Sequence, residues 1–261
     1  MKRILTYLLL PLLLLSCNGG VSGNGTDKPV PEMPEPPENV KQSNVFIVDF
    51  FSTLESEGSF FDGRDTGVAL GFINDQATSG KLSVAYMFDR SDFRPGENNP
   101  LTAMAMNNKL YQFFAQSSPT VNGLIEGTGI ITRYTISDYD GACISDSFIS
   151  GCTQPLPIQN ASKAWIATAR FTSVKAADEL VSAKSLRMIS DAIVVGTVEN
   201  SVKEEIVAAL ESHSLRVMCY GSVDTRKDLI VVLPAGFVCR GIESGKRINL
   251  PYFRVSIEKW M

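Results

Sequence analysis

The chain is organised around the stretch Lys163-Ala-Trp-Ile-Ala-Thr-Ala-Arg-Phe171 and the shorter run Ala192-Ile-Val-Val-Gly196 that follows it. The first run has the β-branched and aromatic content of a strand that is buried on at least one face. The second is wholly apolar and ends in glycine, which is typical of a central strand in a covered sheet. The segment between them predicts an amphipathic helix over about residues 175–190. Ser201 and Glu204 form a capping box that opens a further helix. Because strands and helices alternate, the sequence predicts the α/β class.

The same stretch resembles the endonuclease/exonuclease/phosphatase family. In that family a strand ending in Thr-His-Leu leads to a helix and then to an apolar strand ending in Gly-Asp-x-Asn. Ile166-Ala-Thr-Ala-Arg-Phe171 and Ala192-Ile-Val-Val-Gly-Thr-Val-Glu-Asn200 follow this layout. Thr128-Gly-Ile-Ile-Thr-Arg-Tyr134 is similar to the family's strand after its metal-binding Glu, and Asp228-Leu-Ile-Val-Val-Leu233 to its late Asp-x-Ile-x-Val strand. The resemblance implies a single domain built as a two-sheet β-sandwich flanked by helices.

The residues that carry out catalysis in the family are replaced in this chain. Arg170 stands at the place of the histidine, Thr197 and Glu199 at the places of the Asp and Asn, and Asn249-Leu250 where the final Asp-His pair is expected. The resemblance implies phosphoester cleavage by Mg²⁺ on carboxylates, with a His-Asp pair that activates water. Arginine stays protonated and leucine cannot accept a proton, so neither replacement can act as a general base. The leading prediction is therefore a non-catalytic domain without a cofactor, which binds a ligand or an envelope protein.

Three acidic residues keep a second reading open, a Mg²⁺-dependent phosphoesterase or nuclease with a rearranged site. Asp49 takes the place of the family's first-strand Asn, Glu126 is the candidate counterpart of the metal-binding Glu, and Glu199 can donate a further oxygen. Each has a structural alternative: Asp49 can end a strand, Glu126 can lie in a turn, and Glu199 can favour the N-terminus of the next helix. The only histidine, His213, falls in a predicted helix-to-strand turn, which argues against triad chemistry and against a zinc site.

The N-terminus has the pattern of a bacterial lipoprotein. Met1-Lys-Arg and the apolar run Ile4–Leu15 predict a signal peptide over residues 1–16, and Leu14-Leu-Ser-Cys17 resembles a lipobox with Cys17 as the lipidated residue. A plain secretory signal is the alternative. Residues 17–43 are rich in Pro and Gly and predict a disordered tether, spanning about 30 Å as a random coil. We therefore expect a protein of the cell envelope, anchored by lipid in the outer membrane of a Gram-negative-type bacterium.

Residues 44–261 have the length of one domain. The chain carries 24 Lys and Arg against 28 Asp and Glu, and removal of Lys2 and Arg3 with the signal makes it more acidic still. Phosphate binding needs clustered positive charge, and no basic stripe is present in the sequence. Nucleic acid is therefore not an expected partner.

Four cysteines remain after Cys17, and an oxidising compartment predicts two disulfides. Three pairings are open, and we favour Cys143 with Cys152 and Cys219 with Cys239 because each pair closes a local loop.

The first half of the domain carries weaker signals. Val45–Phe51, Thr66–Phe72 and Leu82–Phe88 are predicted strands, and Asn99-Pro100 is predicted to start a helix that buries Leu110 and Phe113 near its end.

Overall fold

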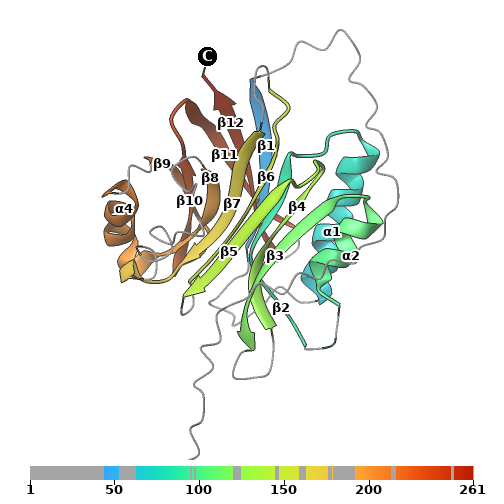
Figure 1. Cartoon of the computed structure of the whole chain (residues 1–261), viewed down its shortest axis with the longest axis horizontal. Helices are drawn as coiled ribbons and strands as arrows, with labels where there is room; N and C mark the ends of the chain where they lie inside the picture. The colour runs from blue at the N-terminus through green and yellow to red at the C-terminus, as the bar shows by residue number, and fades with distance from the viewer. Residues whose placement is uncertain are drawn as a thin grey trace, which may run out of the picture.

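Two six-stranded sheets pack face to face, α1 and α2 cover one of them, and α4 covers the other (Figure 1). The computed structural model describes residues 44–52, 63–94, 96, 98–119, 125–144, 147–158, 163–175, 178, 192–212, 216–247 and 250–260. The first sheet has the order β11 (Phe237–Arg247), β12 (Leu250–Lys259), β1 (Val45–Phe51), β2 (Ala85–Phe93), β4 (Ile125–Thr132) and β3 (Tyr111–Pro119). The second has the order β5 (Asp138–Ile144), β6 (Ser147–Pro155), β7 (Lys163–Phe171), β8 (Ala192–Glu199), β10 (Lys227–Leu233) and β9 (Arg216–Ser222). The helices are α1 (Gly63–Thr78), α2 (Pro100–Asn107) and α4 (Lys203–Ser212), the last preceded by the 3-10 turn η4 (Asn200–Val202).

The predicted α/β sandwich is confirmed, and its organising pair of strands lies at the centre of the second sheet. β7 and β8 are parallel neighbours, paired from Trp165 with Ala192 to Phe171 with Val198. Both strands are buried almost throughout, as predicted for the wholly apolar β8, whereas for β7 burial on at least one face was predicted. Most of the helix predicted over about residues 175–190 lies outside the described residues.

Alternation along each strand decides which side chains face the space between the sheets. On β1, Val48 and Phe50 enter the core between the sheets, whereas Phe51 packs toward α1 and α2. On β10, Leu229 and Val231 enter the same central core, whereas Ile230 packs toward α4. Because successive side chains point to opposite faces, a polar residue two positions beyond a core residue faces its counterparts from the other sheet.

Strand directions give the sandwich two distinct ends. β1 and β2 are parallel, as are β7 and β8, and all four strands finish at the same end. The chain enters β1 and leaves β12 at the opposite end, where Lys259 N donates to Asn44 O at 3.0 Å (Figure 1). Functional side chains at the carboxyl ends of the parallel strands are thus separated from the chain entry by the length of the sheet.

The predicted strand Thr66–Phe72 is wrong, because this segment lies inside α1. Ala69, Phe72 and Ile73 are spaced three and four apart and bury one face of the helix against the first sheet. The helical repeat therefore decides the structure of a segment whose short window also fits a strand.

The start of α2 is confirmed and its predicted length is wrong. The side chain of Asn99 accepts from Leu101 N at 2.9 Å, and Pro100 takes the first helical position. The helix ends at Asn107, Lys109 adopts a positive φ of 55°, and β3 begins directly afterwards. Phe113 therefore belongs to a strand.

Ser201 is not the N-cap of the helix, as the predicted capping box required. Ser201 lies within η4, whose N-cap Glu199 makes no side-chain capping bond. Helical geometry thus begins at Asn200, one residue before the predicted cap.

The predicted disulfide between Cys143 and Cys152 is wrong, because Cys152 is a free and buried thiol. The hairpin register explains this. Cys152 faces Tyr139 across the β5–β6 ladder, whereas Cys143 faces Phe148. Four residues of strand separate the two positions by about 13 Å, well beyond the roughly 7 Å that a disulfide can bridge. The pairing of Cys219 with Cys239 stays a prediction, on the neighbouring strands β9 and β11.

Residues 1–43, which include the predicted signal peptide, Cys17 and the tether, lie outside the described residues. Their roles stay predictions. Of the helices that the structure describes, none is long and apolar enough to span a membrane.

Candidate functional site

A cluster of polar side chains is buried between the sheets where the parallel strands end. It consists of Ser52 after β1, Asp89 on β2, Thr197 on β8 and Lys227 at the start of β10, each at most 1% exposed. Each continues an alternating series of core residues, as Lys227 does before Leu229 and Val231. The two sheets therefore bring together four residues that the sequence leaves far apart.

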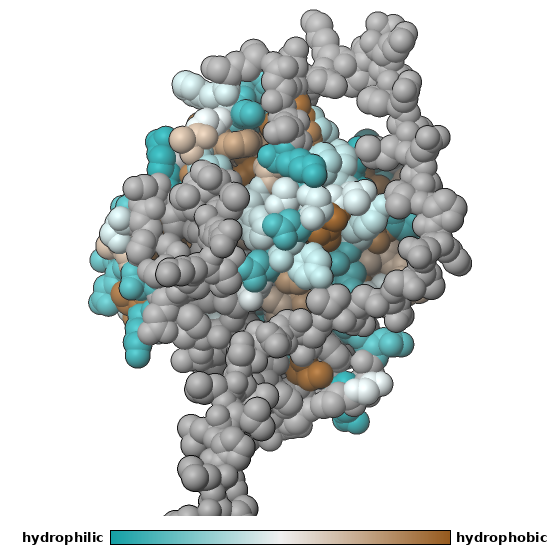
Figure 2. Space-filling model, in the orientation of Figure 1, coloured by the Kyte–Doolittle hydropathy of each residue, from teal (hydrophilic) through white to brown (hydrophobic). Residues whose placement is uncertain are grey.

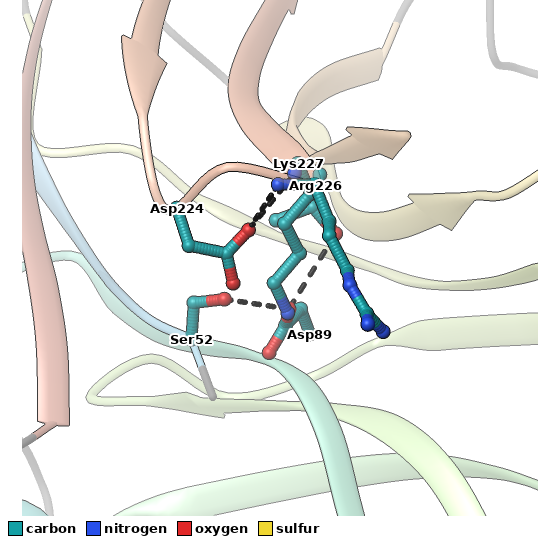
Figure 3. Close-up of polar contacts among 6 residues, drawn as sticks. Ser52, Asp89, Asp224, Arg226 and Lys227 are labelled. Carbon is teal, nitrogen blue, oxygen red and sulfur yellow. Dashed lines mark hydrogen bonds and ion pairs between the residues drawn. The ribbon is translucent and has the colours of Figure 1, made fainter. Parts of the chain in front are cut away.

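Asp89 lies at the centre of this cluster (Figure 3). Its Oδ2 accepts from Lys227 Nζ at 2.8 Å and from Ser52 Oγ at 2.7 Å, and Thr197 Oγ1 lies 3.5 Å away. The other carboxylate oxygen, Oδ1, is buried without a hydrogen-bond partner among the described residues. One oxygen thus carries almost all of the contacts.

The ion pair between Asp89 and Lys227 satisfies the charge of each partner within the protein. Both side chains are 1% exposed. An isolated carboxylate or ammonium at such depth would be strongly destabilising, so buried charges are found paired or bound to metals. Here the countercharge of Asp89 is the ammonium of Lys227.

A tight turn positions Lys227. Asp224 Oδ1 accepts from Arg226 N at 2.7 Å and from Lys227 N at 3.0 Å, and Asn200 N donates to Arg226 O at 2.6 Å. Figure 3 shows Asp224 bonded to the backbone of this turn, with the side chain of Lys227 extending from it to Asp89. The turn therefore fixes the start of β10 and aims the ammonium between the sheets.

Three residues singled out by the family resemblance reach this end of the sandwich. Arg170 and Thr197 are direct neighbours in the β7–β8 ladder, and Arg170 is 7% exposed. Glu199 is the partner of Lys227 in the β8–β10 ladder and is half-buried at the rim. The structure thus places Arg170, Thr197 and Glu199 beside the ion pair.

Asp49 lies elsewhere, on the face of the first sheet that α1 covers. Its Oδ1 accepts from Tyr252 Oη at 2.9 Å and from Arg254 Nε at 3.0 Å, and its Oδ2 accepts from Arg254 Nη2 at 3.2 Å and from the hydroxyl of Ser83. The hydrogen bond from Arg254 to Asp49 raises the pKa of that guanidinium. In the same region, burial raises the pKa of Tyr86 to about 12. Asp49 therefore ties β12 and the loop before β2 to β1, and does not join Asp89.

Among the described residues, no hydrogen bond joins Asp89 to Glu126, although Arg90, the partner of Glu126, directly follows Asp89 on β2. Glu126 on β4 forms an ion pair with Arg90. Leu250 starts β12 and packs into the core under α1 and α2. Asn249 and His213 lie outside the described residues.

Ser52, Asp89 and Lys227 were not among the candidates from sequence. Asp89 directly follows the apolar run Val84–Phe88. An acidic residue at the end of a predicted strand was a signal that could have identified it. Lys227 had none, because the segment Asp224-Thr-Arg-Lys227 has the composition of a solvated turn.

The described residues do not fit a Mg²⁺ site at this place. Magnesium prefers several oxygen ligands in octahedral order, and Asp89 is the one carboxylate at the centre of the cluster, with an ammonium on its bonded oxygen. No group of three or more His, Cys, Asp or Glu side chains within the described part of the chain could hold a metal. The geometry suits a neutralised, hydrogen-bonded cluster.

Several solved structures share this fold. An endonuclease/exonuclease/phosphatase family protein from Leptotrichia buccalis C-1013-b matches with a TM-score of 0.58 at 10% identity, over 82% of this chain and 99% of that chain. The 3′ phosphatase NExo from Neisseria, bound to product DNA hairpin, matches with a TM-score of 0.53 at 10% identity, over 83% of this chain and 100% of that one. Humanized D. rerio TDP2 matches with a TM-score of 0.52 at 8% identity, with the same shares of the two chains.

At these identities the likeness shows the fold, which is the α/β sandwich of endonuclease/exonuclease/phosphatase proteins. No protein-family model matches the chain, and no curated protein matches it.

Proposed function

We propose that this chain is a lipid-anchored cell-envelope protein whose phosphoesterase-like domain is non-catalytic. It binds a ligand or a partner protein at the end of the sandwich that holds Asp89 and Lys227. The observation that carries the proposal is the buried ion pair between these two residues, with 2.8 Å between Nζ and Oδ2.

Lys227 supplies at this place the positive charge that a metal ion would otherwise supply. A divalent cation bound to Asp89 Oδ2 would lie within about 4 Å of the ammonium, where the repulsion amounts to several kcal/mol at an effective dielectric constant of about 20. The carboxylate would also have to give up its hydrogen bonds to Lys227 and Ser52. The pair therefore favours a site without a metal.

The neighbouring residues support the same reading. Arg170 occupies the position of the family's histidine and stays protonated, so it cannot take a proton from water. Thr197 replaces a carboxylate with a hydroxyl that lies 3.5 Å from Asp89. Loss of one positioned acid or base typically lowers a rate by a factor of about 10² to 10⁴. Several such losses at one site leave little catalysis.

The anchor is proposed from the N-terminal sequence. The apolar run Ile4–Leu15, whose end overlaps Leu14-Leu-Ser-Cys17, has the features of a lipoprotein signal. Stable attachment needs two or more acyl chains, which a diacylated and N-acylated cysteine provides. With Cys17 lipidated, residues 18–43 tether the domain to the membrane.

Nucleic acid is not the proposed partner, although one structure with this fold was solved with a DNA product. The chain has a net charge of −4, and its proposed mature form is more acidic. Binding to phosphate backbones depends on clustered Lys and Arg.

A hydrolysis assay tests the non-catalytic reading. The purified protein is incubated with phosphomonoesters, phosphodiesters, phospholipid headgroups and nucleic acids, in Mg²⁺ or Mn²⁺ and with EDTA as the control. We expect equal rates with and without metal. A metal-dependent turnover above about 0.1 per second, lost in Asp89→Asn and retained in Asp49→Asn, would establish the alternative of a Mg²⁺-dependent phosphoesterase.

A further inference from the structure

Trp260 is exposed at the end of the sandwich where the chain enters the domain. Its backbone is held, since Trp260 N donates to Gly236 O at 2.7 Å and the adjacent Lys259 N donates to Asn44 O at 3.0 Å. Its side chain is nevertheless 63% exposed. In the face that Figure 2 shows, hydrophobic residues form separate spots among hydrophilic ones. The end beside the chain entry therefore presents an exposed tryptophan whose backbone is hydrogen-bonded.

Basic side chains surround this end. Lys163 begins β7, Arg216 begins β9 and Arg133 follows β4, and all three are exposed. Lys259 lies over the ring of Phe237, with 5.8 Å from Nζ to the centroid.

Acidic groups also lie at this end. Asp138 begins β5, the exposed Glu211 lies in the last turn of α4 shortly before β9, and Glu258 is engaged by Arg240. The end thus combines an exposed aromatic ring with a predominantly basic rim.

We propose that this end, defined by Trp260, Lys259, Lys163, Arg216 and Arg133 and called here the entry end, rests on the anionic headgroup layer of the membrane that holds the lipid anchor. The inference depends on the anchor in the proposed function. Tryptophan is amphipathic and favours the interface between headgroups and acyl chains. Lysine and arginine near an anionic surface are attracted to it.

Because of the tether, even a weak contact between the entry end and the headgroup layer is enough to orient the domain. Asn44, where the domain begins, is bonded to Lys259 and so lies beside Trp260. A tether of about 30 Å holds the entry end at a high effective concentration near the surface, so a contact too weak for free protein is occupied.

This orientation places the ion-pair site away from the membrane. Ser52 follows the last residue of β1, a strand of 7 residues that spans about 23 Å. Asp89 and Lys227 lie beside Ser52 at that distal end. The ligand or partner is therefore met in the aqueous phase and not in the membrane.

The fluorescence of Trp260 can report its contact with the membrane, because the chain has only two tryptophans and Trp165 is buried. The full lipidated protein is reconstituted into vesicles of phosphatidylethanolamine and phosphatidylglycerol, with spin-labelled lipids that quench at headgroup depth. The Trp260→Phe variant gives the Trp165 signal for subtraction. We expect Trp260 emission to shift to the blue and to be quenched severalfold more than Trp165 emission.

Charge variants test the basic rim. Lys163→Glu should reduce the quenching of Trp260, whereas Lys246→Glu, an exposed lysine on β11 near the distal end, should leave it unchanged. Protein that floats with the vesicles but keeps water-exposed and unquenched Trp260 emission would overturn the membrane contact and leave the anchor intact. Protein that fails to float with the vesicles would overturn the anchor, and the membrane contact with it.

Discussion

Lys227 Nζ lies 2.8 Å from Asp89 Oδ2, with both side chains 1% exposed, and this ion pair joins β10 of one sheet to β2 of the other. The partners are 138 positions apart in the sequence. The pair is therefore both a chemical feature of the candidate site and a contact that holds the two sheets together.

Removal of one partner should destabilise the fold strongly. Lys227→Ala leaves the carboxylate of Asp89 buried without its countercharge, so we expect the free energy of unfolding in urea to fall by about 3 to 5 kcal/mol. Lys203→Ala is the matched control. Lys203 pairs with Asp228 at 2.6 Å, but its side chain is 28% exposed, and its loss should lower the free energy of unfolding by less than about 1 kcal/mol.

Replacement of both partners separates charge from packing. The double variant Asp89→Leu/Lys227→Met should recover most of the lost stability, because apolar side chains of similar volume can replace a buried ion pair. Equal losses in Lys227→Ala and Lys203→Ala would contradict the account of Asp89 as a carboxylate that depends on Lys227.

Asp49 should act in stability and not in chemistry. Asp49→Ala removes the acceptor of Tyr252, Arg254 and Ser83, and we expect a loss of about 3 to 5 kcal/mol in the same urea measurement. Asp49→Asn keeps the shape and should lose less. A variant Asp49→Ala of unchanged stability would show that this network is not structural.

Cys152 should be unreactive in the folded protein. Burial raises the pKa of its thiol to about 12, so almost no thiolate is present at pH values near neutrality. We expect a disulfide reagent to label the Cys152 peptide only after denaturation, as mass spectrometry would show. Rapid labelling of native protein, or a bonded Cys152 after denaturation without reductant, would contradict a buried free thiol.

The same raised pKa predicts a pH dependence of stability. Above its ordinary pKa of 9.0, the thiol of the unfolded chain loses its proton, whereas the folded thiol keeps it up to about 12. The free energy of unfolding should therefore decrease as the pH rises from about 9 to 11, and decrease less in Cys152→Ala. Equal slopes for the two proteins would contradict the shift.

Cys17→Ala should abolish membrane attachment, because the proposed anchor depends on that thiol. We expect the variant to be soluble or unprocessed in cell fractionation with an acyl label. Recovery of labelled variant in the membrane fraction would contradict the lipoprotein proposal.

The sandwich was predictable where long apolar patterns decide the structure. β7 and β8 are buried on both faces. The wholly apolar run Ala192–Gly196 indicated this for β8, whereas the sequence of β7 indicated burial on at least one face. Thr66–Phe72 was assigned to a strand because a short window of mixed residues fits two periods. Packing of Ala69, Phe72 and Ile73 on the first sheet, which no local window contains, decides for the helix.

The site was predictable only in part, because its central contact joins distant strands. Arg170 and Thr197 lie on the two strands that sequence identified, and the ladder makes them neighbours. Lys227 follows a turn in which lysine is ordinarily solvated, and only the register of β10 turns it inward. Asp49 was a candidate because it is an acid in the first strand, but alternation along β1 points it to the opposite face.

A calorimetric titration with Mn²⁺ tests most directly whether Lys227 takes the place of a cation at Asp89. Wild-type protein, Asp89→Asn, Lys227→Ala and the double variant Lys227→Ala/Asp89→Asn are compared at equal concentration, with Lys203→Ala as the control. We predict no saturable binding that depends on Asp89 in wild type or Lys203→Ala, new binding in Lys227→Ala, and its loss in the double variant. Saturable Mn²⁺ binding by the wild-type protein that disappears in Asp89→Asn would contradict the account.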